Sequence, residues 1–157
     1  GSFTGIRIGV GTVLAFKDSL NIPCIGISSL EALAYNINTD GIICSLIDAK
    51  NNNVYFGVFE KKNNIVTQLE EFSFKTIDEI IPILQKYNKI IFVGDGSTQH
   101  KEFLHSNFNT STFSDKNDLS SFSLGLAGLS AYNKNINSDL MPLYLRKSQA
   151  ERALEKN

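Results

Sequence analysis

The stretch that opens the chain, residues 4–20, predicts a long helix that is apolar or small around most of its circumference. At about 100° per residue, its thin polar sector consists of Arg7, Gly11 and Asp18. A surface helix of a globular protein usually carries one apolar stripe, roughly 100° wide or a little wider. We therefore expect this helix to be covered on at least two sides.

Small residues give the same helix a second unusual property. Gly5, Gly9 and Gly11 lie inside it, and each glycine costs roughly 1 kcal/mol relative to alanine in a helix. Gly5 and Gly9 share one face with Thr12, where another backbone can approach closely. Two interpretations stay open: a buried helix packed on its own sheet, or a helix that serves both its own domain and a partner chain. Arg7 leaves a similar choice, because its stem can lie over apolar neighbours or its head can meet a partner.

The charge and the cysteines exclude several classes of function. Fifteen Lys and Arg residues against sixteen Asp and Glu residues give a net charge of −1, so strong nucleic-acid binding by this chain alone is not expected. Cys24 and Cys44 lie in apolar runs, where buried reduced thiols are typical, and their spacing indicates neither a disulfide framework nor a zinc site. No apolar run reaches the roughly 18 residues of a membrane span. We expect a cytoplasmic protein.

The rest of the pattern alternates strands and helices around a polar boundary at residues 36–41. Before it, a strand at 23–27 precedes a helix at 30–35 that Ser28 or Ser29 caps. After it, strands at 42–48, 54–60 and 65–74 are joined by Asn- and Lys-rich hairpin loops. A helix capped by Thr76 follows, with a kink or break caused by Pro82.

The C-terminal half is expected to continue with shorter elements. We predict a parallel strand at 89–93, a helix at 98–105 and a strand at 110–113. A long helix capped by Asp118 comes next, then an extended segment at 142–146 and a helical or frayed tail at 148–156. One face of the long helix carries large apolar residues and the remainder carries small ones that allow close packing: Leu119, Phe122, Leu126 and Leu129, against Ala127, Gly128 and Ala131.

Four separated motifs give the chain a family resemblance. They are GSFTGIRIG at 1–9, IGISSLEALA at 25–34, LIDA at 46–49 leading into VYF at 54–56, and PLYLR at 142–146. In this order they resemble the bacterial TsaB family, from the first residue to about Ala150. The family has a Gly-Pro pair and some sixty further residues before the first motif, so the resemblance implies a fragment. We interpret Gly1 and Ser2 as native sequence, because both fit the motif.

The resemblance implies an α/β fold of the actin-like, Hsp70-like (ASKHA) class, with two lobes. Residues 1–38 would be the remnant of a truncated first lobe, and residues 39–157 a complete second lobe with a mixed sheet and helices. In that superfamily a glycine pair packs against the adenosine of a bound nucleotide, and Gly94-Asp95-Gly96 resembles it. Glycines in a tight strand-to-helix turn are also common for backbone reasons alone, so the turn has two interpretations.

The predicted chemistry of the chain is sparse. Asp48 lies where the superfamily places its second phosphate loop, but the loop here is Ala-Lys-Asn-Asn-Asn rather than glycine-rich. That departure argues against ATP hydrolysis, and Asp48 is interpreted as a turn-stabilising residue. His100 and His105 are five residues apart, so one helix cannot aim both at one metal ion, unlike the histidine pair of the catalytic TsaD relatives. Ser28 and Ser29 lack a nucleophile motif.

We therefore expect no catalytic residues and no metal site. The resemblance implies a non-catalytic subunit that pairs with TsaD, and also meets TsaE, in forming N6-threonylcarbamoyladenosine on tRNA. tRNA, ATP and ADP would be met only in the complex; a homodimer is an alternative association, and no membrane is involved. The alternatives are a nucleotide-dependent enzyme of the same superfamily, such as a small-molecule kinase, or a peptidase-like protein. The residues assigned to partner binding are Phe3, Thr4, Gly5, Arg7, Ile8, Gly9 and Thr12.

Overall fold

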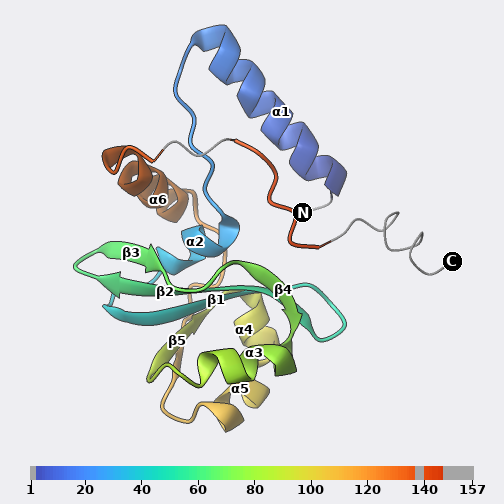
Figure 1. Cartoon of the computed structure of the whole chain (residues 1–157), viewed down its shortest axis with the longest axis vertical. Helices are drawn as coiled ribbons and strands as arrows, with labels where there is room; N and C mark the ends of the chain where they lie inside the picture. The colour runs from blue at the N-terminus through green and yellow to red at the C-terminus, as the bar shows by residue number, and fades with distance from the viewer. Residues whose placement is uncertain (1–2, 137–139, 147–157) are drawn as a thin grey trace, which may run out of the picture. The chain divides into compact units, whose positions relative to one another are not determined.

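A computed structural model describes residues 3–136 and 140–146 of the chain. It divides into two compact units (Figure 1). The first unit combines Gly1–Gly26 with Ala131–Asn157, and the second is Ile27–Ser130. The two lobes expected at 1–38 and 39–157 have other limits and stay a prediction. The expected tail at 148–156 and the first two residues lie outside the described residues.

The second unit is built on a six-stranded mixed sheet. Its order is β3-β2-β1-β5-β6, and β4 also pairs with β2. β1 is antiparallel to β2 and parallel to β5, which in turn is parallel to β6. The strands are β1 (Gly41–Asp48), β2 (Asn53–Lys62), β3 (Ile65–Gln68), β4 (Ser73–Thr76), β5 (Ile90–Val93) and β6 (Thr112–Phe113).

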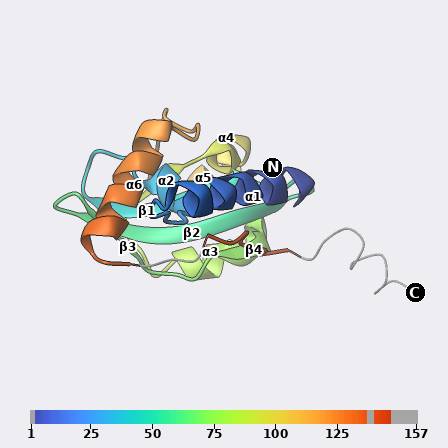
Figure 2. The same ribbon diagram turned by 90° about the horizontal axis from the view of Figure 1, so that it is seen from above.

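Helices cover both faces of this sheet (Figure 1, Figure 2). On one side lie α2 (Ser29–Ala34) and α6 (Ser121–Asn133), and on the other lie α3 (Ile77–Leu84), α4 (Asp95–Gln99) and α5 (Lys101–Asn107). Successive residues of a strand point to opposite faces, so β1 buries Cys44 and Leu46 in the core that α3 and α5 share. This double cover explains why β1 and β2 are apolar on both faces.

The third predicted strand, at 65–74, is wrong as one element, because it forms two strands. β3 ends opposite Phe59 of β2, and β4 begins opposite Phe56. The four residues 69–72 therefore span a stretch in which β2 has only two residues. The ladder of backbone hydrogen bonds to β2 is interrupted there. The backbone N–H groups of Leu69 and Glu70 both donate to the Val58 carbonyl at this break.

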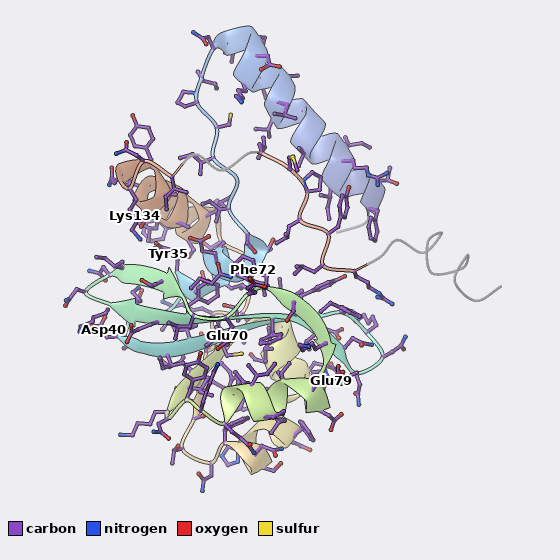
Figure 3. All side chains as sticks on the ribbon, in the orientation of Figure 1. Tyr35, Asp40, Glu70, Phe72, Glu79 and Lys134 are labelled. Atoms are coloured by element: carbon purple, nitrogen blue, oxygen red, sulfur yellow. The ribbon has the colours of Figure 1, made fainter. Side chains whose placement is uncertain are left out.

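Side chains fix the chain in this crossing (Figure 3). The Tyr87 hydroxyl donates to a Glu70 carboxylate oxygen at 2.5 Å, and Lys86 pairs with the same carboxylate. These bonds hold the pKa of the Glu70 carboxyl below its ordinary value. The Phe72 ring covers Gly57, where an added Cβ would lie 2.8 Å from the ring. The alternation of apolar and polar residues along the sequence predicts none of these contacts.

The helices on the α3 side confirm some predictions and correct others. Thr76 and Glu79 form the predicted capping box at the start of α3. Pro82 lies inside α3 without breaking it, so the expected break is wrong. The helix expected at 98–105 is also wrong as one element: α4 already begins at Asp95, and His100 separates it from α5 with φ −109° and ψ 21°.

Asn36 connects α2 to the start of α6. Its side-chain amide donates to the backbone carbonyls of Lys116 and Asp118, at 2.8 and 2.9 Å. Its carbonyl oxygen accepts from the Ser123 hydroxyl at 2.5 Å. The predicted cap at Asp118 is wrong, because the Ser120 hydroxyl accepts from the Phe122 N–H instead. Helix α6 therefore begins at Ser121.

Helix α6 buries its small residues and exposes its large apolar residues. Its small residues face inward, with Ala127 0% and Ser123 4% exposed. Its large apolar residues face outward, and Phe122 is 72% exposed. The shared apolar face predicted from the sequence is an exposed stripe in this structure: Leu119, Phe122, Leu126 and Leu129.

The first unit contains the opening helix and two irregular segments. Helix α1 (Phe3–Leu20) ends as predicted, followed by Asn21 in the left-handed conformation at φ 50°. The strand predicted at 23–27 is wrong: these residues form no regular structure, because no strand of the described part of the chain pairs with them. The C-terminal segment (residues 140–146) is also irregular. No helix in the described residues is long and apolar enough to cross a membrane.

A candidate partner interface on the first helix

Helix α1 buries none of its residues. Ile8 is 65% exposed, Phe16 55% and Leu20 62%. The described part of the chain therefore does not provide the cover on two sides that the sequence predicts. An exposed helix of this length with three internal glycines lacks the packing that normally stabilises helices in proteins.

One face of α1 is partly covered, and we call it the inner face: Phe3, Arg7, Val10 and Leu14. Phe3, Val10 and Leu14 are the half-buried residues of the helix. The Phe3 ring stacks on the ring of Tyr144 in the C-terminal segment, with centroids 5.3 Å apart and an interplanar angle of 7°. Arg7 Nε donates to the Tyr144 hydroxyl at 2.8 Å, and the guanidinium carbon lies 5.5 Å from the Tyr144 ring centroid.

The residues predicted to bind a partner are divided by this arrangement. Phe3 and Arg7 lie on the inner face with Tyr144. The others lie away from it, on what we call the outer face: Thr4, Gly5, Ile8, Gly9 and Thr12. At about 100° per residue, Gly5 and Thr12 are about 180° from the centre of the inner face.

The outer face is compatible with close packing. An added Cβ at Gly9 would meet no atom within 4 Å, so the described chain does not explain the glycine by crowding. The Thr12 hydroxyl donates to the Ile8 carbonyl at 2.9 Å, which satisfies it inside the helix. Removing water from an apolar surface costs little free energy when its polar group is already hydrogen-bonded within the protein.

Tyr144, which contacts the inner face of α1, is a residue that the sequence did not predict to lie there. It lies 137 positions from Arg7 along the chain, and no local pattern connects them. The PLYLR motif marked the segment only as part of a family resemblance. The flat stack on Phe3 and the bond to Arg7 come from tertiary structure alone.

The Gly94-Asp95-Gly96 turn is the second predicted site, and its glycines have a packing role. Gly94 has φ 102° and ψ 165°, a conformation that is essentially restricted to glycine. An added Cβ at Gly94 would lie 2.1 Å from the Leu46 carbonyl oxygen. At Gly96 it would lie 3.0 Å from the Leu46 carbonyl carbon. Both glycines let the start of α4 lie directly on β1.

Several polar groups around this turn are bonded within the protein, although His100 Nε2 is buried without a hydrogen-bond partner among the described residues. The Asp48 N–H donates to Asp95 Oδ1 at 2.9 Å, and the Gly94 N–H donates to Asn117 Oδ1 at 2.8 Å. Lys50 Nζ lies 2.6 Å from the Asp48 carboxylate, and this hydrogen bond lowers the pKa of the Asp48 carboxyl. The loop after Asp48 turns through left-handed residues, with Asn51 at φ 53°. This geometry agrees with a turn-stabilising role for Asp48.

Other reactive residues of the described chain are not assembled into a site. No group of three His, Cys, Asp or Glu side chains within residues 3–136 and 140–146 could hold a metal ion. His100 lies between α4 and α5, whereas His105 stacks against Phe113. Cys44 is fully buried, and burial raises the pKa of its thiol.

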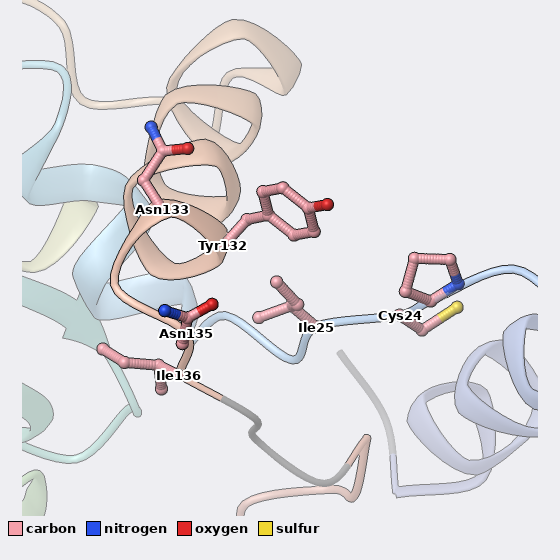
Figure 4. A pocket seen from close by; sticks show the side chains of 7 residues that line it. Cys24, Ile25, Tyr132, Asn133, Asn135 and Ile136 are labelled. Atoms are coloured by element: carbon pink, nitrogen blue, oxygen red, sulfur yellow. The ribbon is translucent and has the colours of Figure 1, made fainter.

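The first unit also has an open pocket of about 390 Å³ (Figure 4). Half-buried Cys24 lies in its wall. None of the residues predicted to bind a partner or a nucleotide lines it. The lining residues are Pro23, Cys24, Ile25, Tyr132, Asn133, Asn135 and Ile136.

Comparison with known proteins gives one consistent group of relatives. A family model described as TsaD, tRNA N6-adenosine threonylcarbamoyltransferase, matches residues 1–154. The tRNA threonylcarbamoyladenosine biosynthesis protein TsaB of Bacillus subtilis is 33% identical over 115 residues, which cover 72% of this chain and 50% of the relative. The protein of the same name from Haemophilus influenzae is 29% identical, over 93% of this chain and 66% of the relative. This chain thus spans about half to two thirds of the length of these relatives.

Solved structures establish the fold. A Pseudomonas aeruginosa protein described as uncharacterized, with similarity to peptidase YEAZ, matches with a TM-score of 0.72 and 23% identity, over 93% of this chain and 69% of that one. YeaZ from the same organism matches with a TM-score of 0.71 and 21% identity, over 92% of this chain and 70% of that one. With the family model, these structures show the actin-like α/β fold that the resemblance implies.

The packing role of Gly94 predicts a large loss of stability in Gly94→Ala. A glycine-only conformation costs alanine about 1–3 kcal/mol, and the contact with Leu46 forces the backbone to move as well. We expect the free energy of unfolding to fall by about 3 kcal/mol or more, measured by urea denaturation.

Gly128→Ala in α6 is the matched control. An added Cβ there meets nothing within 4 Å, so the same substitution is expected to raise stability by about 0.5–1 kcal/mol. A Gly94→Ala variant as stable as wild type that has lost binding of ADP would show instead that Gly94 serves a ligand.

Proposed function

This chain belongs to the TsaB family, and we propose from that membership that it is a non-catalytic subunit pairing with TsaD. The pair would form N6-threonylcarbamoyladenosine on tRNA, with the chemistry in TsaD. The names of the relatives support the pathway, and the outer face of α1 supports the pairing.

The observation that carries the proposal is the combination of glycine and exposure in α1. The helix contains three glycines at unfavourable helical positions, and an added Cβ at Gly9 or Gly11 meets nothing in the described chain. The helical costs of Gly9 and Gly11 are therefore not offset by close packing inside the described chain. A partner helix lying against the outer face would offset such costs, because apolar burial contributes about 25 cal/mol per Å².

A supporting rather than a catalytic role agrees with the second unit. The Asp48 loop is filled with side chains, and its carboxylate is bonded to Lys50. The close packing of α4 on β1 accounts for Gly94 and Gly96 without a nucleotide. ATP and ADP would therefore be met only in the complex, as would TsaE. The net charge of −1 favours tRNA binding through the partner rather than by this chain.

Association with TsaD is the first test of this function. Analytical ultracentrifugation of the chain, alone and mixed with TsaD, is expected to show a complex that Ile8→Glu weakens at least about tenfold, equivalent to about 1.4 kcal/mol. The reason is that the new carboxylate would lose its hydration at the interface. Sedimentation of the chain alone also reports whether it self-associates.

Ile65→Glu is the matched control, because Ile65 is 51% exposed on the edge strand β3. It makes the same change of charge on a strand of the second unit, outside the proposed contact surface, and should leave the affinity unchanged. If wild type does not bind TsaD, the proposed pairing is wrong. If both variants bind TsaD as tightly as wild type, the outer face of α1 is not the contact surface.

An assay of ATP hydrolysis is the second test. The purified chain is expected to hydrolyse no ATP above the buffer rate, measured by phosphate release, because its phosphate-loop position holds the Asp48–Lys50 pair. Turnover that Asp48→Ala abolishes would contradict this expectation and favour the nucleotide-dependent enzyme.

A further inference from the structure

Tyr144 contacts the opening helix at two points one turn apart. Its ring stacks on Phe3, and its hydroxyl accepts the hydrogen bond from Arg7 Nε at 2.8 Å. Phe3 and Arg7 are separated by four residues, so both side chains extend from the same face of α1. Tyrosine suits this place because one side chain supplies both an apolar ring and a polar hydroxyl.

Each of the two contacts constrains a different motion of the helix. The near-parallel stack, at an interplanar angle of 7°, fixes how the first turn lies on the C-terminal segment. The hydrogen bond is directional and fixes the Arg7 side chain, whose guanidinium also lies over the Tyr144 ring. Together they set which face of α1 turns toward the C-terminal segment.

This constraint matters because most of the surface of α1 is exposed. The helix buries none of its residues, and helices stabilised only by their own hydrogen bonds are marginal. Arg7 is also the charged residue nearest the outer face in sequence, flanking Ile8.

We propose that Tyr144 is a positioning residue for the outer face of α1. It holds Arg7 and Phe3 against the C-terminal segment, so that Gly5, Gly9 and Thr12 meet a partner helix in one orientation. This role rests on the proposed pairing with TsaD. Binding is tighter when a surface is already ordered, because less conformational entropy is lost on association.

The test is a double-mutant cycle on the affinity of the full chain for TsaD. Tyr144→Phe keeps the ring stack and removes the bond to Arg7; it is expected to weaken binding roughly three- to tenfold, which lies within the net range of one ordinary intramolecular hydrogen bond. Tyr144→Ala removes both contacts and should weaken binding further. In an Arg7→Leu background, Tyr144→Phe should have no additional effect.

Two controls separate positioning from general stability. Tyr132→Phe removes a hydroxyl from an exposed tyrosine of α6 and should leave the affinity unchanged. The urea midpoint of Tyr144→Phe should equal that of wild type. In the free chain, the Arg7 Nε–H resonance should shift on Tyr144→Phe, because its acceptor has been removed.

The outcomes distinguish this inference from the function on which it rests. If wild type does not bind TsaD, the pairing is wrong and the positioning role falls with it. If wild type binds and Tyr144→Phe binds equally tightly, only the role of Tyr144 is wrong. An equal loss on Tyr144→Phe with Arg7 and with Leu at position 7 also overturns it, because the effect would then not pass through Arg7.

Discussion

A long helix without buried residues has to be stabilised by something other than its own hydrogen bonds, and this constraint governs the first unit. Helix α1 carries three glycines, whose helical costs together come to about 3 kcal/mol. Tyr144 attaches its inner face to the C-terminal segment through Phe3 and Arg7. The outer face stays exposed, and its small residues are suited to the close helix–helix contact that we propose.

The second unit satisfies its own constraints internally. Asn36 makes three hydrogen bonds that join α2 to the start of α6. Gly94 and Gly96 let α4 lie on β1, and Asp95 is bonded to the Asp48 N–H. The glycines, the Gly94 N–H and the Asp95 carboxylate of the turn that resembles a nucleotide site thus have partners within the protein. Exposed small residues on α1 and a bonded turn at α4 are the features expected of a subunit that acts by association.

Local chemistry was readable from the sequence, whereas long-range contacts were not. The Thr76–Glu79 capping box and the Ser28 cap were predictable because both partners lie within one helical turn. The split of the 65–74 strand depends on Glu70 bonding to Tyr87, and the start of α6 depends on Asn36 binding the Asp118 carbonyl. The residues of each pair are too far apart in the sequence for a helix or strand period to predict their contact.

The candidate sites show the same limit. Glycine spacing was enough to indicate the outer face of α1, because residues four apart share a helical face. The packing role of Gly94 could not be predicted without its φ of 102° and its distance to Leu46, and its contact with a nucleotide stays a prediction. The strand predicted at 23–27 failed because apolar composition alone does not supply a neighbouring strand.

The most direct test of the central claim measures which face of α1 a partner covers. In a Cys24→Ser background, with Cys44 fully buried, Thr12→Cys places a thiol on the outer face and Lys17→Cys places one nearer the inner face. With TsaD at about 100 times its Kd, alkylation at position 12 should slow on the order of 100-fold, while the rate at position 17 stays close to that of the free chain. Equal rates at position 12 with and without TsaD, or equal slowing at both positions, would contradict the account.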